Sequence, residues 1–155
     1  MKPAFHLCKT KHLANAMAGE GARLAGGRWN SPGLPVVYAA FSLSLTTLEV
    51  MVHLEETEVF YQLFSWLGLE IPGEIIEPLD IIHLPDGWHS DETNADSRAL
   101  GNQWLRSMRS AVLAVPSVVT EGEKNYLLNP RHPDFGKIRV APAQPFRPVA
   151  RLRKM

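Results

Sequence analysis

The sequence of 155 residues has one cysteine, Cys8, and no excess of charge of either sign. A single cysteine excludes an intramolecular disulfide and a cysteine-based zinc site. Sixteen lysines and arginines balance sixteen aspartates and glutamates, so the formal net charge is +0 with neutral histidines. Because nucleic acids and anionic membranes attract basic surfaces, this balance gives no electrostatic reason to expect either partner.

Long hydrophobic runs are also absent. Residues 1–12 lack the apolar stretch that forms the core of a signal peptide. The most apolar region, residues 36–54, is interrupted by Glu49, His53 and several hydroxyl side chains, which is atypical of a membrane span. We therefore expect a cytoplasmic protein without a membrane segment.

The usual metal and nucleotide motifs are missing as well. The six histidines show no metal-ligand spacing, so no metal site is expected. The glycines form neither a dinucleotide fingerprint nor a phosphate-binding P-loop. No basic stripe accompanies the four tryptophans, which are therefore predicted to anchor the core or loops rather than to stack on bases.

The residues that are present predict one domain with a sizeable core, since 45% of them are hydrophobic. Residue patterns predict short strands and loops over residues 70–92, and longer elements elsewhere. The predicted strands are 35–40, 58–67, 111–119 and 125–130, and the predicted helices are 41–56 and 94–110. The apolar face of the second helix is expected to consist of Ala99, Leu100, Trp104 and Met108. Strands and helices do not alternate strictly, which favours an α+β fold with a mainly antiparallel sheet over a doubly wound parallel fold.

The stretch GGRWNSPG, residues 26–33, is the first candidate for chemistry. Its glycines would let the backbone approach a ligand and expose amides to an anion. The planar guanidinium group of Arg28 suits a phosphate. A surface turn with a solvated arginine would give the same pattern, so this stretch alone does not decide between the two.

Glu49 is the second candidate. On a helix over residues 42–56, Leu45, Leu48 and Val52 form an apolar stripe and Glu49 lies beside it. The helix is apolar nearly all round, which predicts that it is buried. A carboxyl group within it must then be paired, protonated or open to a cleft. A structural glutamate, bonded to an arginine or a backbone amide, and a functional one are equally compatible with this.

Tyr38 and Ser117 each allow two interpretations. Tyr38 lies on the predicted buried strand, either as a core tyrosine with a satisfied hydroxyl or as a ring that lines a cleft. Ser117 follows Pro116 near the end of a strand, where a hydroxyl often bonds the backbone. No G-x-S-x-G motif surrounds Ser117, so a hydrolase nucleophile has no support.

Two segments together resemble the RES domain family, which is named for an arginine, a glutamate and a serine. They are GARLAGGRWNSPGLPVVYAAFSLSLTTLEVMVHL (21–54) and VLAVPSVVTEGEKNYLLNPRHPDF (112–135). The resemblance covers most of the chain, and the spacing from GGRWN through Y, LE and PS to NYLLNP is highly specific. It implies a single RES domain over residues 1–155. The implied fold has a mainly antiparallel split sheet, similar to ADP-ribosyltransferase catalytic domains.

The resemblance also implies a function. RES proteins are toxins of bacterial type II toxin–antitoxin pairs, each neutralised by an Xre-type antitoxin. The implied activity is destruction of NAD by hydrolysis or phosphorolysis of its nicotinamide–ribose bond. Inorganic phosphate would be a co-substrate in the second case, and no cofactor beyond the substrate NAD is expected. ADP-ribosylation of a host protein and a non-enzymatic nucleotide-binding module are the alternatives, and a homodimer within a larger complex is left open.

The family's functional residues map onto a set in this chain. The implied catalytic residues are Arg28, Tyr38, Glu49 and Ser117, and the implied NAD-contacting residues are Gly27, Arg28, Asn30, Tyr38 and Asn125. Arg28 and the glycine amides would meet the phosphates, and the Tyr38 ring would stack on nicotinamide or ribose. Glu49 would bind ribose hydroxyls and stabilise the positive charge that develops during cleavage. Ser117 would bond the nicotinamide amide or a ribose hydroxyl.

Overall fold

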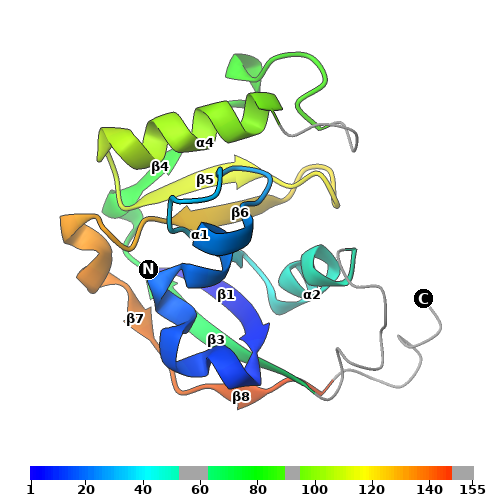
Figure 1. Cartoon of the computed structure of the whole chain (residues 1–155), viewed down its shortest axis with the longest axis vertical. Helices are drawn as coiled ribbons and strands as arrows, with labels where there is room; N and C mark the ends of the chain where they lie inside the picture. The colour runs from blue at the N-terminus through cyan, green and yellow to red at the C-terminus, as the bar shows by residue number, and fades with distance from the viewer. Residues whose placement is uncertain (53–62, 90–94, 148–155) are drawn as a thin grey trace.

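The computed structural model describes residues 1–52, 63–89 and 95–147 (Figure 1). The strands are β1 Lys2–Lys9, β2 Val37–Ala40, β3 Phe64–Ile71, β4 Ile76–Pro78, β5 Val112–Pro116, β6 Lys124–Leu128, β7 Arg139–Val140 and β8 Gln144–Pro145. The α-helices are α1 Glu20–Ala25, α2 Leu43–Met51 and α4 Ala95–Ser107. Short 3-10 helices are η1 Thr10–Ala18, η2 Gly73–Ile75, η3 Ile81–His83 and η4 Pro133–Lys137.

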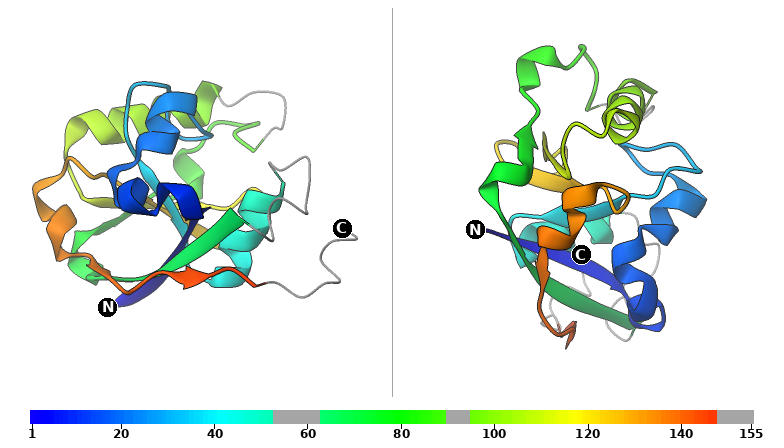
Figure 2. Two further views of the ribbon diagram at one scale, coloured as in Figure 1. Left: turned by 60° about the horizontal axis from the view of Figure 1, so that its bottom comes forward. Right: turned by 90° about the vertical axis from the view of Figure 1, so that its left-hand side faces the viewer.

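The strands form one eight-stranded sheet in the order β4-β5-β6-β2-β1-β3-β7, with β8 also paired to β3. The pairing of β4 with β5 is parallel, and the other pairings are antiparallel. The sheet is strongly twisted, so β1 and β3 run at an angle to β5 and β6 (Figure 2). The α+β class with a mainly antiparallel sheet is thus confirmed.

Apolar side chains pack on both faces of the sheet. Successive residues of a strand point to opposite faces, so Val112 and Leu128 join one core cluster while Leu113, Val115 and Leu127 join another. The second cluster also contains Trp29 and Trp104, which are 3% and 1% exposed. We call the sheet face that carries Leu113, Val115 and Leu127 the α4 face, because α4 covers it. Both tryptophans are core residues, as predicted.

Most of the predicted elements are present, although with shorter bounds. The strands at 35–40, 111–119 and 125–130 correspond to β2, β5 and β6, and the helices at 41–56 and 94–110 correspond to α2 and α4. The strand expected at 58–67 overlaps only the start of β3, and residues 58–62 lie outside the described residues. Strand β1 was not predicted, because its burial does not alternate and so leaves no period of two in the sequence.

Helix α2 begins as expected but is buried differently. The Ser42 hydroxyl accepts a hydrogen bond from the Leu45 amide at 3.1 Å, the geometry of an N-cap. The buried residues are Leu45, Thr46 and Thr47, whereas Val52 is 60% exposed. The predicted burial all round the helix is therefore wrong. The predicted stripe fails at Val52 because α2 ends at Met51.

The buried face of helix α4 matches the predicted one only in part. The sequence favoured an apolar face of Ala99, Leu100, Trp104 and Met108. The residues that are buried are Ser97, Gly101, Trp104 and Leu105, and Met108 is 41% exposed. The prediction is confirmed for Trp104 and for Leu100, which packs against the same core cluster, and is wrong for the exposed Ala99 and Met108. Part of α4 packs against the backbone of residues 27–31, which requires small and hydrogen-bonding side chains rather than apolar bulk.

The partly buried His6 should make the stability of the fold depend on pH. Its Nδ1 lies 2.6 Å from the Tyr38 carbonyl oxygen, and burial lowers the pKa of His6 below its ordinary value of 6.5. The unfolded chain therefore binds more protons than the native state as the pH falls below about 6.5. The stability present above that pH is lost on acidification.

We expect His6→Asn, which keeps a nitrogen donor near the Nδ1 position, to show a shallower loss of unfolding free energy between pH 7.5 and pH 5.5. Urea titrations at the two pH values measure it, and the exposed His12 supplies the matched control, His12→Asn. Equal losses in wild type and His6→Asn would contradict this expectation.

Candidate active site

The loop of residues 26–33 is a tight turn built from its glycines. The Gly27 amide donates to the Asn30 carbonyl at 2.9 Å, and the two residues form an isolated β-bridge. A Cβ on Gly27 would lie 2.6 Å from the Tyr38 hydroxyl oxygen, so only glycine permits this approach. Gly26 takes a positive φ of 73°, which other residues adopt at a cost.

The glycine amides are not available to an anion, so their predicted contribution to phosphate binding is wrong. The Gly26 amide donates to the Ala22 carbonyl at 2.8 Å, and the Gly33 amide donates to the Arg23 carbonyl at 2.7 Å. The amide of Gly27 is engaged in the turn. Backbone hydrogen bonds of the turn itself use these donors, which leaves the Arg28 side chain as the loop's predicted phosphate ligand.

Asn30 and Tyr38 together hold this loop. Asn30 is 0% exposed, and its Nδ2 donates to the carbonyls of Ala22 at 2.9 Å and Leu34 at 3.0 Å. The Tyr38 hydroxyl donates to Asn30 Oδ1 at 2.6 Å and accepts from the Trp29 amide at 3.1 Å. The structure therefore places the Asn30 side chain inside the loop, bonded to the backbone and to Tyr38, and its predicted contact with NAD stays a prediction.

The Tyr38 hydroxyl is a neutral structural donor. Burial raises the pKa of Tyr38 well above its ordinary value, and this effect outweighs the hydrogen bond from Trp29 and the positive charges of Arg98 and Arg28, which act in the opposite direction. Because both partners of the hydroxyl belong to the loop, the predicted ligand contact of Tyr38 depends on its ring. That contact stays a prediction.

Arg28 is fixed from two sides. Its Nη1 donates to the Trp88 carbonyl at 3.3 Å. Its own carbonyl accepts a hydrogen bond from the Ser97 hydroxyl at 2.6 Å, and the preceding carbonyl, that of Gly27, accepts one from Arg98 Nε at 2.7 Å. Helix α4 thus binds the backbone on which Arg28 is carried.

Glu49, Ser117 and Asn125 form a second cluster. Glu49 Oε1 accepts hydrogen bonds from the Ser117 hydroxyl and from Asn125 Nδ2, both at 2.7 Å. These residues lie 68 and 76 positions from Glu49 in the sequence, on α2, just after β5, and on β6. The other carboxyl oxygen, Oε2, accepts no hydrogen bond from a described residue. The two donors orient the carboxyl group and leave that oxygen available.

Ser117 serves this cluster as a positioning group. It is 5% exposed, and its oxygen also accepts hydrogen bonds from the amides of Val119 and Thr120, each at 3.1 Å. Its single hydroxyl proton is directed to Glu49. The expected contact of Ser117 with a ligand stays a prediction, and the structure places the hydroxyl against the carboxyl group instead.

Asn125 carries an unsatisfied buried acceptor. Its Oδ1 is buried and has no hydrogen-bond partner among the described residues. Buried polar atoms in folded proteins nearly always have partners, so each exception calls for an explanation. An N–H or O–H group of a bound ligand beside Glu49 would satisfy this oxygen.

Strand register places the two clusters next to each other. Tyr38 pairs with Leu127, and Ala40 pairs with Asn125, between β2 and β6. Asn125 and Leu127 are two residues apart and therefore share the α4 face with Tyr38. Diagonal neighbours of this kind are about 7–8 Å apart. The structure thus brings all seven residues of the predicted set into two adjoining clusters, one with Arg28 and one with Glu49.

Sequence reasoning missed the α4 side of the site. Ser97, Arg98, Gly101 and Asn102 contact the loop, the last through hydrogen bonds from the Ser31 amide at 2.9 Å and to the Ser31 hydroxyl at 2.8 Å. Their spacing of one, four and five positions lies on one helix face. The polar side chains on this face were the one sign of the contact in the sequence. Without knowledge of the loop that packs there, such a face is indistinguishable from an ordinary solvent-exposed one.

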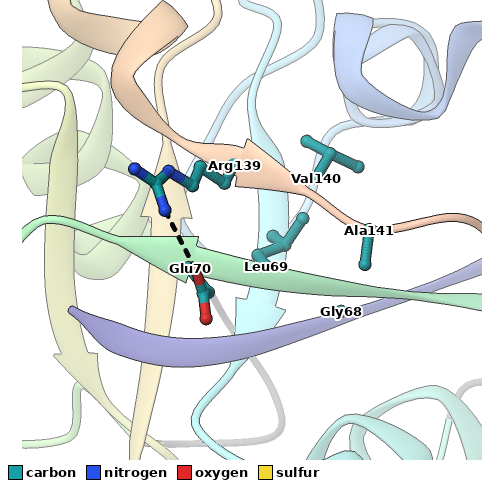
Figure 3. A pocket seen from close by; sticks show the side chains of 6 residues that line it. All are labelled: Gly68, Leu69, Glu70, Arg139, Val140 and Ala141. Atoms are coloured by element: carbon teal, nitrogen blue, oxygen red, sulfur yellow. Dashed lines mark ion pairs between the residues drawn. The ribbon is translucent and has the colours of Figure 1, made fainter.

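A surface hollow lies away from this site, at the edge of the sheet (Figure 3). It has a volume of about 420 Å³ and is lined by Gly68, Leu69, Glu70, Arg139, Val140 and Ala141. The Glu70–Arg139 ion pair across it is 3.9 Å long, between side chains that are 59% and 77% exposed, so it contributes little to stability. None of the predicted site residues lines it.

Two negative findings apply to residues 1–52, 63–89 and 95–147 only. They include no group of three or more histidines, cysteines, aspartates or glutamates arranged to hold a metal ion. They also include no helix with the length and apolar character needed to cross a membrane.

The chain is similar to bacterial toxins along most of its length. It is 38% identical to Toxin Res of Photorhabdus laumondii subsp. laumondii over 133 aligned residues. These residues make up 86% of this chain and 85% of that protein. It is 39% identical to the Prs ADP-ribosylating toxin of Sphingobium sp. over 130 aligned residues, which make up 82% of this chain and 80% of that toxin. A third relative, Toxin Res of Pseudomonas putida, is 36% identical over 137 residues, which cover 88% and 92%.

The fold has a solved counterpart in the M. tuberculosis MbcT–MbcA toxin–antitoxin complex. The superposition has a TM-score of 0.79 and covers 99% of this chain and 90% of that chain, at 18% sequence identity. At that identity the likeness concerns the fold alone. The sequence profile of the RES domain, in turn, matches residues 3–148. Together with the identities of 36–39% to its relatives, this match establishes that the chain belongs to the RES domain family.

Proposed function

We propose that this protein is a toxin enzyme that cleaves the nicotinamide–ribose bond of NAD and is neutralised by a cognate antitoxin. One observation carries the proposal: two donors hold Glu49 by Oε1 while Oε2 stays available, beside the loop that carries Arg28. The resemblances to proteins named toxins support it.

The chemistry of the substrate fits these groups. NAD carries a diphosphate, two riboses and a positively charged nicotinamide, and cleavage develops oxocarbenium character on one ribose. A fixed carboxylate stabilises that positive charge and accepts hydrogen bonds from ribose hydroxyls, while a guanidinium group pairs with phosphate oxygens. Glu49 Oε2 would take the first role and Arg28 the second.

The unsatisfied Oδ1 of Asn125 adds a constraint on the ligand. An acceptor at this position requires a donor, and NAD offers ribose hydroxyls and the N–H groups of the nicotinamide carboxamide. Because Nδ2 of the same side chain is bonded to Glu49, the amide would hold substrate and carboxylate in register. The Tyr38 ring, on the same sheet face, would stack on the nicotinamide or the ribose.

Transfer of ADP-ribose to a protein is the second candidate function. The relative from Sphingobium sp. is named Prs ADP-ribosylating toxin, which favours this alternative for a chain 39% identical to it. NAD cleavage and ADP-ribose transfer both break the bond between nicotinamide and C1″ of its ribose, and nicotinamide takes the bonding electrons. The reactions differ in the nucleophile that then bonds C1″, which is water, inorganic phosphate or a protein side chain.

An antitoxin partner follows from the same reasoning. The structural neighbour was solved as a toxin–antitoxin complex, and an enzyme that destroys NAD would poison the cell that makes it. We propose a partner of the Xre type that covers the candidate site around Arg28 and Glu49.

Mass spectrometry of the products tests the proposed function. The purified protein is incubated with NAD alone, with added phosphate, and with a cell lysate. Free ADP-ribose indicates hydrolysis, its 1″-phosphate indicates phosphorolysis, and an ADP-ribose label on a protein indicates transfer. Binding of NAD without any release of nicotinamide would overturn the enzymatic proposal and leave a nucleotide-binding module.

A further inference from the structure

Arg98 is a cation of the site that the sequence did not reveal. It lies on α4, and its Nε donates to the Gly27 carbonyl at 2.7 Å. The side chain is partly exposed, and its terminal nitrogens Nη1 and Nη2 have no hydrogen-bond or ion-pair partner within the described part of the chain. The guanidinium group is thus oriented by one bond and keeps most of its donors available.

Arg98 and Arg28 both lie near the Tyr38 hydroxyl group. Arg98 binds the carbonyl of the residue that precedes Arg28. Both positive charges act on the Tyr38 hydroxyl, where each lowers the pKa of Tyr38 against the larger effect of burial. Two positive charges that act on the same hydroxyl group also repel each other, and an anion that binds both relieves this repulsion.

We propose that Arg98 contacts the diphosphate of NAD together with Arg28, which makes Arg98 a determinant of affinity for phosphate-containing substrates. The inference rests on the proposed function, because that function supplies the diphosphate. Arginine suits the task since its planar fork binds phosphate oxygens in pairs. The bond to Gly27 reduces the side-chain freedom that binding would otherwise remove.

A purely structural role is the competing explanation. In that case Arg98 only ties α4 to the loop, and its charge is irrelevant to the ligand. The substitution Arg98→Gln separates the two roles, because glutamine keeps an N–H donor at the ε position and can retain the Gly27 bond without the charge. The exposed Arg106, on the same helix, supplies a matched control in Arg106→Gln.

Calorimetric binding of ADP-ribose and of nicotinamide riboside is the test. ADP-ribose carries the diphosphate, whereas nicotinamide riboside carries no phosphate. Arg98→Gln should weaken ADP-ribose binding by about tenfold to hundredfold, the usual range for loss of a charge-assisted contact. It should also reduce the salt dependence of that binding. Nicotinamide riboside binding should be unchanged, and Arg106→Gln should match wild type with both ligands.

Each contrary outcome has a distinct meaning. Unchanged ADP-ribose affinity in Arg98→Gln, with wild type still consuming NAD, overturns the role of Arg98 alone. Equal weakening of both ligands assigns Arg98 a structural role and overturns the proposal as well. A wild-type protein that binds neither ADP-ribose nor NAD overturns the proposed function together with this inference.

A second variant covers the case in which Arg98→Gln does not fold, as judged by its thermal transition. Arg98→Lys keeps the charge but lacks the planar fork. Weaker binding of ADP-ribose with unchanged binding of nicotinamide riboside then supports the proposal. Unchanged binding of both ligands, or equal weakening of both, overturns it.

Discussion

Replacing Glu49 by glutamine is expected to slow NAD cleavage by about 10²–10³-fold, the usual cost of removing one electrostatic contact to a transition state. Glutamine has nearly the shape of glutamate and keeps an Oε1 that accepts from Ser117 and Asn125. The change therefore removes the negative charge near the developing oxocarbenium ion and leaves the hydrogen-bonded frame in place. The loss should appear in kcat, because the charge develops only in the transition state.

Nicotinamide release, followed over time at saturating NAD, measures this effect. The exposed Glu74 on η2 provides a matched control, and Glu74→Gln should retain wild-type turnover. Thermal unfolding checks that Glu49→Gln has kept its fold. Full turnover by a folded Glu49→Gln protein would remove Glu49 from the catalytic set.

Gly101→Ala is expected to destabilise the protein by about 3 kcal/mol or more and to lower NAD cleavage as well. Alanine normally stabilises a helix by about 0.5–1 kcal/mol relative to glycine, so the expected sign is reversed. The reason is local: a Cβ on Gly101 would overlap the Trp29 carbonyl oxygen and lie 3.0 Å from the Trp29 Cβ. A backbone carbonyl cannot turn aside as a flexible side chain does.

The displacement should reach the site because α4 also holds the Gly27 and Arg28 carbonyls. Gly21→Ala is the matched control, since Gly21 lies in helix α1 and a Cβ there meets nothing within 4 Å. Urea unfolding should show Gly21→Ala as stable as wild type or slightly more stable. A Gly101→Ala protein with wild-type stability would mean that α4 does not pack against Trp29 as described.

The elements that could be predicted are those whose own residue types indicate their burial or their ends. The strands that became β2, β5 and β6 are rich in β-branched and apolar residues, and the Ser42 cap of α2 needs only its own first turn. Strand β1 was not predicted because both of its faces are partly covered, so buried and exposed residues do not alternate along it. The burial of Ser97 and Gly101 on α4 was not predicted because these residues pack against backbone rather than against apolar side chains.

The candidate site also has a part that could be predicted from the sequence and a part that could not. Its residue types, and their spacing along the chain, identified Arg28, Tyr38, Glu49, Ser117 and Asn125 through a resemblance to the RES family, and the match over residues 3–148 confirmed that family. The roles of the glycine amides could not be predicted. Whether an amide is free or engaged depends on the turn it makes, and here the turn engages those of Gly26, Gly27 and Gly33.

By itself, the sequence determined the family and the α+β class, and it supplied the set of residues predicted to form the site, because all three depend on residue types in linear order. Only the tertiary structure decided which groups meet. It joined Glu49 to Ser117 and Asn125 across 68 and 76 positions, and it placed Arg98 beside the Arg28 loop. Hydrogen bonds act over about 3 Å, whereas the order of residues along a chain contains no distances until strand pairing and helix packing set them.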